Sequence, residues 1–99
     1  QQPVLAIADI EIDSARHRAS RAGRELRLTR KEFGVLEVLA TAADSVVSAE
    51  YLLEHVWDEQ ADPFTNAVRI TIMTLRRKLG DPPVIETVVG VGYRMSVPT

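Results

Sequence analysis

The segment from Asn66 to Gly80 carries four basic side chains and no acidic one, although the whole chain has a formal net charge of −2. Between these cations lie amide, hydroxyl and apolar side chains. The set is Asn66, Arg69, Ile70, Thr71, Met73, Thr74, Arg76, Arg77 and Lys78. Arginine and lysine meet phosphates or guanine edges, amides and hydroxyls bond base edges or phosphates, and isoleucine and methionine can touch thymine methyl groups. The segment therefore combines the side-chain types that can contact DNA.

The spacing of the same segment predicts one helix with two different faces. At about 100° per residue, the apolar residues Val68, Ile72, Leu75 and Leu79 fall in one stripe that faces the core. The opposite face is centred on Asn66, Ile70, Met73, Thr74 and Arg77, with Arg69, Arg76, Thr71 and Lys78 on its flanks. Basic residues in a last helical turn also stabilise the helix dipole without a ligand, so Arg77 and Lys78 alone favour neither interpretation.

Two more helices are expected before this one. Thr29 and Glu32 have the spacing of a capping box, which predicts a helix from Thr29 to about Ala43. Ser48 can cap a second, shorter helix whose inward side chains are Leu52, Leu53, Val56 and Trp57. An acidic stretch stopped by Pro63 then leads to Thr65 or Asn66, either of which can cap the third helix, and Gly80 ends that helix.

Strands are expected at both ends of the chain. The first 28 residues alternate between apolar and polar types, which predicts a small antiparallel sheet, and residues 84–97 alternate around Gly90 and Gly92 as a hairpin does. Five arginines lie in the first part: Arg16, Arg18, Arg21, Arg24 and Arg27. Charges on the solvated face of a sheet explain them better than a binding site does.

The composition limits the classes of function. The 99 residues suit one compact domain, the apolar content of 45% suits a globular one, and the absence of cysteine removes disulfides and thiolate metal sites. No apolar run is long enough to span a bilayer, so a soluble, cytoplasmic domain without membrane contact is expected. His17 and His55 have no metal-binding spacing and no nucleophile and base form a pattern, so neither an enzyme nor a bound metal or cofactor is expected.

Four segments carry a specific resemblance: "LTRKEFGVLEVLA", "LLEHVW", "NAVRITIMTLRRKLG" and "IETVVGVGYRM". In this order and spacing they resemble the DNA-binding effector domain of OmpR/PhoB-family two-component response regulators. The resemblance implies an α+β winged helix-turn-helix with an N-terminal four-stranded antiparallel sheet, three helices and a C-terminal hairpin wing over residues 1–99. It also implies a preceding receiver domain outside this sequence and a cognate histidine kinase, with two protomers bound head to tail on direct repeats.

The resemblance further implies which residues contact double-stranded DNA. The recognition helix corresponds to residues 65–79, and its DNA-facing set is Asn66, Ile70, Thr71, Met73, Thr74, Arg76 and Arg77. Trp57, Thr87 and Tyr93 match positions that contact the DNA backbone. Val89 lies at the wing tip, where well-known relatives carry an arginine, so more apolar contacts are expected here.

One further surface and one alternative function follow. The acidic loop that holds Asp58, Glu59 and Asp62 would repel phosphate, and in the resembled family this loop often touches RNA polymerase. A solvated connection explains the acids nearly as well. Because winged helices also serve as adaptors and the net charge is negative, a protein-interaction module without DNA binding is the alternative function.

Overall fold

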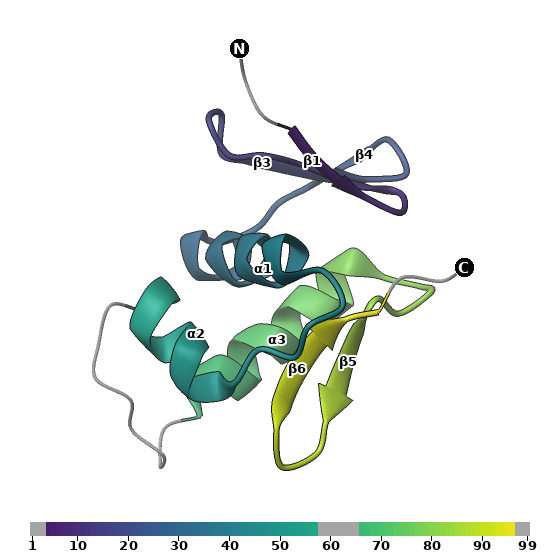
Figure 1. Ribbon diagram of the computed structural model, residues 1–99. Helices are drawn as coiled ribbons and strands as arrows, with labels where there is room; N and C mark the ends of the chain where they lie inside the picture. The colour runs from purple at the N-terminus through teal and green to yellow at the C-terminus, as the bar shows by residue number, and fades with distance from the viewer. Residues whose placement is uncertain (1–3, 58–65, 97–99) are drawn as a thin grey trace.

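The computed structural model describes residues 4–57 and 66–96, in which a sheet is followed along the chain by three helices and a hairpin (Figure 1). The order of elements along the chain is β1(Val4–Ile7), β2(Ile10–Asp13), β3(Arg18–Arg21), β4(Arg24–Leu26), α1(Arg30–Ala42), α2(Ala49–Val56), α3(Ala67–Leu79), β5(Ile85–Val88) and β6(Gly92–Met95). The expected four-stranded sheet, three helices and C-terminal hairpin are confirmed.

The N-terminal strands form an antiparallel sheet in the order β1-β2-β3-β4. Ile10 and Ile12 of β2 point to its inner face and are fully buried, with Ala19 of β3 and Leu26 of β4 beside them. Figure 1 shows this sheet on one side of α1, with α2, α3 and the hairpin on the other. Helix α1 is therefore the middle layer of the core.

The start of α1 is the capping box that the sequence predicts. The backbone N–H of Glu32 donates to the Thr29 hydroxyl at 3.2 Å, and the Glu32 carboxylate accepts from the backbone N–H of Thr29 at 2.8 Å. Val35, Leu36 and Leu39 then lie in the centre of the core with no exposed surface. Gly34 has a packing role as well, because a Cβ there would lie 2.9 Å from a methyl group of Val56 on α2.

Helices α2 and α3 form the helix pair that follows. The Ser48 hydroxyl caps α2 as expected by accepting from the N–H of Tyr51 at 3.1 Å. Four side chains of α3 are buried in the core: Val68, Ile72, Leu75 and Leu79. Asn66 is the N-cap residue of α3, one of the two that the sequence offers, but its side chain forms no capping hydrogen bond. Thr65, the other expected cap, lies outside the described residues.

The hairpin β5–β6 is joined to the segment between α1 and α2 by a short backbone bridge. The N–H of Val47 donates to the carbonyl of Tyr93 at 2.7 Å, and the N–H of Tyr93 donates back at 2.8 Å. Gly92 lies against this bridge, and a Cβ at that position would be 2.1 Å from the Val47 carbonyl oxygen. The close approach therefore requires glycine at position 92.

Candidate nucleic-acid interface

The side of α3 that faces away from the core exposes one continuous row of side chains. Asn66, Ile70, Met73 and Arg77 follow one another at helical spacing and are all exposed; we call them the outer stripe. Ile70 is 54% exposed and Met73 is 52% exposed. Arg69 is exposed beside the stripe. Helix α3 thus presents two large apolar side chains among cations.

One flank of α3 is bound to α1 through Glu32. Lys78 donates from Nζ to Oε1 of Glu32 at 2.7 Å, and Thr74 donates from its hydroxyl to Oε2 at 2.6 Å. The sequence places Thr74 at the centre of the exposed face, and the structure corrects this placement. Thr74 is half-buried on the flank of the helix, because its hydroxyl is the partner of a buried carboxylate. Thr71, also half-buried, offers Thr74 its backbone carbonyl at 3.0 Å.

Glu32 is a carboxylate that the fold keeps charged although it is only 4% exposed. Burial alone would raise the pKa of Glu32 above its ordinary value of 4.5. Hydrogen bonds from Lys78 and Thr74, followed by the one from the N–H of Thr29 and by the charge of Lys78, outweigh burial and lower this pKa to about 2. The charge of Lys78 is therefore compensated within the protein.

The other flank of α3 is bound to the hairpin through Arg76. Its Nε donates to the carbonyl of Ile85 at 3.3 Å, and its Nη2 donates to the hydroxyl of Thr87. The structure thus brings together Arg76 of the recognition helix and Thr87 of the hairpin, both of which the resemblance implies as DNA contacts. Arg76 is half-buried, whereas Arg77 on the next position is exposed. Arg69 and Arg77 remain the exposed cations of α3.

The C-terminal end of α3 is held by Arg21, a residue expected on a solvated sheet face. Arg21 is 3% exposed, so this expectation is wrong. Its guanidinium donates to the carbonyls of Leu79 and Gly80, both at 3.1 Å, and to that of Pro82 at 2.6 Å. Its Nε also pairs with Asp9 at 3.1 Å. The guanidinium is buried because it satisfies carbonyls that the helix end leaves without partners.

The tip of the hairpin is apolar and exposed. Val89 is 90% exposed, and Val91 is 58% exposed across the turn. Gly90 between them has a φ of 78°, which favours glycine. Tyr93, the second residue of β6, is half-buried and pairs with Thr87 of β5. Val91 is not in the set predicted from sequence to contact DNA, although it lies between the two glycines of the predicted hairpin.

The remaining expected contacts lie around the end of α2. Trp57 is half-buried against the core, and the ammonium of Lys31 lies 5.5 Å from the centre of its ring. The same ammonium donates to the carbonyl of Val56 at 3.1 Å. Asp58, Glu59 and Asp62, assigned from sequence to a polymerase contact, lie outside the described residues.

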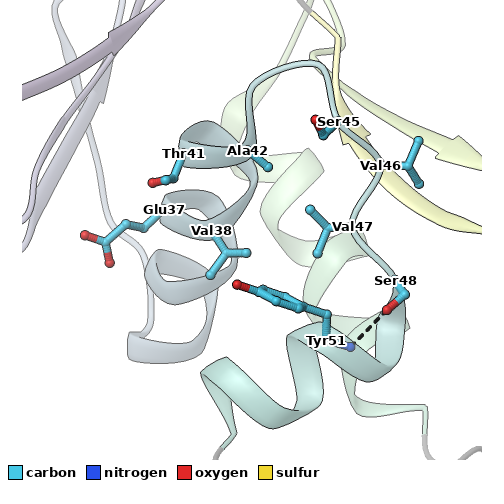
Figure 2. A pocket seen from close by; sticks show the side chains of 9 residues that line it. All are labelled: Glu37, Val38, Thr41, Ala42, Ser45, Val46, Val47, Ser48 and Tyr51. Carbon is cyan, nitrogen blue, oxygen red and sulfur yellow. Dashed lines mark hydrogen bonds between the residues drawn. The ribbon is translucent and has the colours of Figure 1, made fainter.

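A groove of about 620 Å³ lies between α1 and the start of α2, and no residue of α3 lines it. Figure 2 shows the ring of Tyr51 extending between the two helices near Val38 and Val47. The carboxylate of Glu37 on its rim accepts a hydrogen bond from Ser14. In the described ranges 4–57 and 66–96, no cluster of three metal-binding side chains occurs. No helix in these ranges is both long and apolar enough to cross a membrane.

The fold and the exposed face of α3 together define a winged helix-turn-helix domain, with α2 and α3 as the helix pair and β5–β6 as the wing. The chain belongs to the family "Transcriptional regulatory protein, C terminal", whose model matches residues 23–95. This finding confirms the resemblance to OmpR/PhoB-type effector domains.

Similar proteins are known in sequence and in structure. The transcriptional regulatory protein CutR of Streptomyces coelicolor is 60% identical over 93 residues, which cover 94% of this chain and 43% of that protein. The chain therefore spans less than half the length of this relative. The DNA-binding domain of CpxR from E. coli has a TM-score of 0.88 and 37% identity, covering 94% of this chain and 95% of that one. The DNA-binding domain of Klebsiella pneumoniae RstA, in complex with the RstA box, has a TM-score of 0.87 and 27% identity, covering 94% and 96%.

Proposed function

We propose that this domain binds double-stranded DNA sequence-specifically and controls transcription as the effector domain of a two-component response regulator. Helix α3 enters the major groove, and the wing contacts the adjacent DNA. The observation that carries the proposal is the outer stripe, in which Ile70 and Met73 are more than half exposed next to Arg77. A merely solvated helix face would favour polar residues at these positions.

The charges of α3 support the same function. The chain as a whole is slightly acidic, yet α3 contains no acidic residue. Glu32 compensates Lys78 and the wing holds Arg76, so Arg69 and Arg77 are the cations of α3 that are left to meet phosphates. Phosphate contacts carry no sequence information, so a DNA-binding surface of few cations and two apolar side chains distinguishes DNA sequences mainly through base contacts.

A relative that was solved with its DNA site supports the proposal as well. The RstA domain, in complex with the RstA box, has the same fold over 96% of its chain. In the proposed complex, the exposed residues Asn66, Arg69, Ile70, Met73 and Arg77 face the major groove. Thr71, Thr74 and Arg76 position the helix, and Trp57, Thr87, Val89 and Tyr93 lie towards the DNA backbone or the minor groove.

The larger protein and its partners belong to the proposal too. Membership in this family implies that the larger protein has a receiver domain and a cognate histidine kinase. It also implies that two protomers bind half-sites arranged as direct repeats. The proposed function places the domain in the cytoplasm, where bacterial DNA lies. Asp58, Glu59 and Asp62 remain a predicted contact for RNA polymerase, since an acidic loop next to a basic helix suits a partner other than DNA.

Selection of duplexes from a random pool tests this function. The domain should enrich a shared short motif, and its affinity for that motif should exceed its affinity for scrambled duplex and should fall as salt rises. Replacing Arg18 by Ala supplies a control, because this exposed arginine lies on β3 of the N-terminal sheet. Recovery of no motif, with no salt-dependent binding, would contradict DNA binding and favour a protein-interaction module.

A further inference from the structure

The two apolar side chains of the outer stripe determine what kind of base edge this domain can read. Ile70 and Met73 are 54% and 52% exposed at the centre of the α3 surface. We propose, on the basis of the proposed DNA binding, that Ile70 and Met73 recognise the 5-methyl groups of two thymines in the half-site. The ligand class is thus a half-site that contains thymines at defined positions, read mainly through apolar contact.

Three polar neighbours of these side chains, Thr74, Lys78 and Arg76, are engaged within the protein. Thr74 is bound to Glu32 at 2.6 Å and Lys78 to the same carboxylate at 2.7 Å. On the opposite flank, Arg76 donates to the carbonyl of Ile85 at 3.3 Å. Polar side chains that could have bonded base edges are thus held against α1 and the wing. The centre of the surface is left to Ile70 and Met73, with Asn66 and Arg77 at its two ends.

The chemistry of the major groove then selects thymine. Guanine, adenine and cytosine present hydrogen-bonding groups there, whereas thymine adds an apolar methyl group. An isoleucine or methionine placed over a donor or acceptor would remove water from that group without replacing its hydrogen bond, which disfavours the other bases. Over a thymine, the same side chain buries a methyl group instead.

The spacing of the pair indicates how far apart the two thymines lie. Residues three apart on a helix have Cβ atoms roughly 5–6 Å apart, and successive bases of one strand rise by about 3.4 Å. The two methyl groups therefore lie within about two base steps of each other, on the same strand or on opposite strands. Asn66, one turn before Ile70, has the side chain that pairs with adenine, the partner of thymine.

A uracil scan of the selected duplex tests the proposal with the wild-type domain. Each thymine of the half-site is replaced singly by deoxyuridine, which removes only the methyl group and keeps the base pairing. At two positions within about two base steps, affinity should fall roughly fourfold, the factor that one buried methyl group is worth. Replacement at other thymines should leave affinity unchanged. Equal affinity for all the uracil duplexes would overturn the proposal while leaving DNA binding itself intact.

Variants of the domain assign each methyl group to a side chain. Each of the variants Ile70→Ala and Met73→Ala should lose the affinity decrease caused by uracil at one of the two positions, a different position for each variant. The reason is that the side chain that contacts that methyl group is gone. Arg77→Ala should weaken binding overall but keep both uracil effects. Thermal melting verifies that each variant is folded, as expected for exposed positions. Persistence of both uracil effects in Ile70→Ala and in Met73→Ala would overturn the assignment.

The base 5-methylcytosine carries the same methyl group as thymine. A second random pool of duplexes, which contains both bases, therefore distinguishes these two sources of the methyl group. Thymine differs from 5-methylcytosine in offering an acceptor at position 4 instead of a donor. In a pool that contains both bases, thymine should be enriched at the two sensitive positions. Enrichment of 5-methylcytosine there would overturn the identification of thymine. A pool that yields no motif at all would contradict the proposed function and this proposal together.

Discussion

The ammonium of Lys78 on α3 lies 2.7 Å from Oε1 of Glu32 on α1, in an ion pair whose carboxylate side chain is 5% exposed. The same glutamate closes the capping box with Thr29 and accepts from Thr74. One buried carboxylate therefore stabilises the start of α1 and fixes how α3 is rotated against it. Because Lys78 and Thr74 are engaged in this way, the position of Glu32 helps to determine which side chains of α3 face outward.

Glu32 should make the stability of the domain depend on pH. Its pKa is lowered from 4.5 to about 2 in the folded state, so the folded state favours the charged form. This stabilisation is complete above about pH 4.5 and is lost as pH falls towards 2, with a free energy of about 3 kcal/mol at most. Urea unfolding over this pH range should show the loss in the wild type and a flatter profile in Glu32→Gln.

Glu37→Gln is the matched control, since it removes the same charge from the same helix and its carboxylate contacts Ser14 rather than α3. At neutral pH, Glu32→Gln should lower the free energy of unfolding by about 2 kcal/mol, because Lys78 loses a charged partner. Equal stability and equal pH profiles of the two variants would contradict the role of Glu32.

Arg21 should be a main stabilising contact between the N-terminal sheet and α3. Arg21→Met keeps an unbranched apolar stem but leaves the carbonyls of Leu79, Gly80 and Pro82 without this donor. The free energy of unfolding should fall by about 3 kcal/mol. Arg18→Met on the same strand should cost little, because Arg18 is exposed. Urea unfolding of the two variants measures the difference, and losses of similar size would argue against a capping role for Arg21.

Gly92 should be required for the bridge between the wing and the segment before α2. In Gly92→Ala the new Cβ would meet the Val47 carbonyl oxygen, and relieving this clash should cost about 3 kcal/mol. Gly90→Ala meets no atom within 4 Å and should cost only about 1–2 kcal/mol for its positive φ. Hydrogen exchange should show lost protection of the Val47 amide in the first variant alone. Retained protection of the Val47 amide in Gly92→Ala would show that the backbone can shift to accommodate the Cβ, which would contradict the requirement for glycine at position 92.

Arg76 and Arg77 should differ in what they contribute, although they are neighbours in sequence. Arg76→Ala removes donors to Ile85 and Thr87 and should lower stability by about 1 kcal/mol. Arg77→Ala should leave stability unchanged, because Arg77 is exposed. Thermal melting of the two variants compares them, and identical melting temperatures would mean that Arg76 does not hold the wing.

Local patterns predicted most of the architecture. The capping box of Thr29 and Glu32, the Ser48 cap and the end of α3 at Gly80 each depend on residues close together in the sequence, and all three are confirmed. The core stripe of α3 follows from helical spacing, and its four residues are buried as expected. The antiparallel sheet and the hairpin follow from alternation in the same way.

The errors concern contacts between segments that are far apart in the sequence. The helical wheel places Thr74 near the outer face, but it does not show that Glu32 lies close enough to bind its hydroxyl. Arg21 is charged, so its type predicted exposure, although it shares the inner face of β3 with Ala19. Its burial depends on carbonyls at the end of α3, whose position only the tertiary structure supplies. The DNA-facing set itself remains a prediction.

The salt dependence of binding to the selected duplex tests most directly whether the outer stripe is the DNA-binding surface. Affinity is measured over a series of salt concentrations for the wild type, Arg77→Ala and the control Arg18→Ala. Arg77→Ala should bind more weakly, and its plot of log affinity against log salt should be less steep by about 1, the value for one lost phosphate contact. Arg18→Ala should match the wild type in both affinity and slope. Unchanged affinity and slope in folded Arg77→Ala would contradict DNA binding through α3.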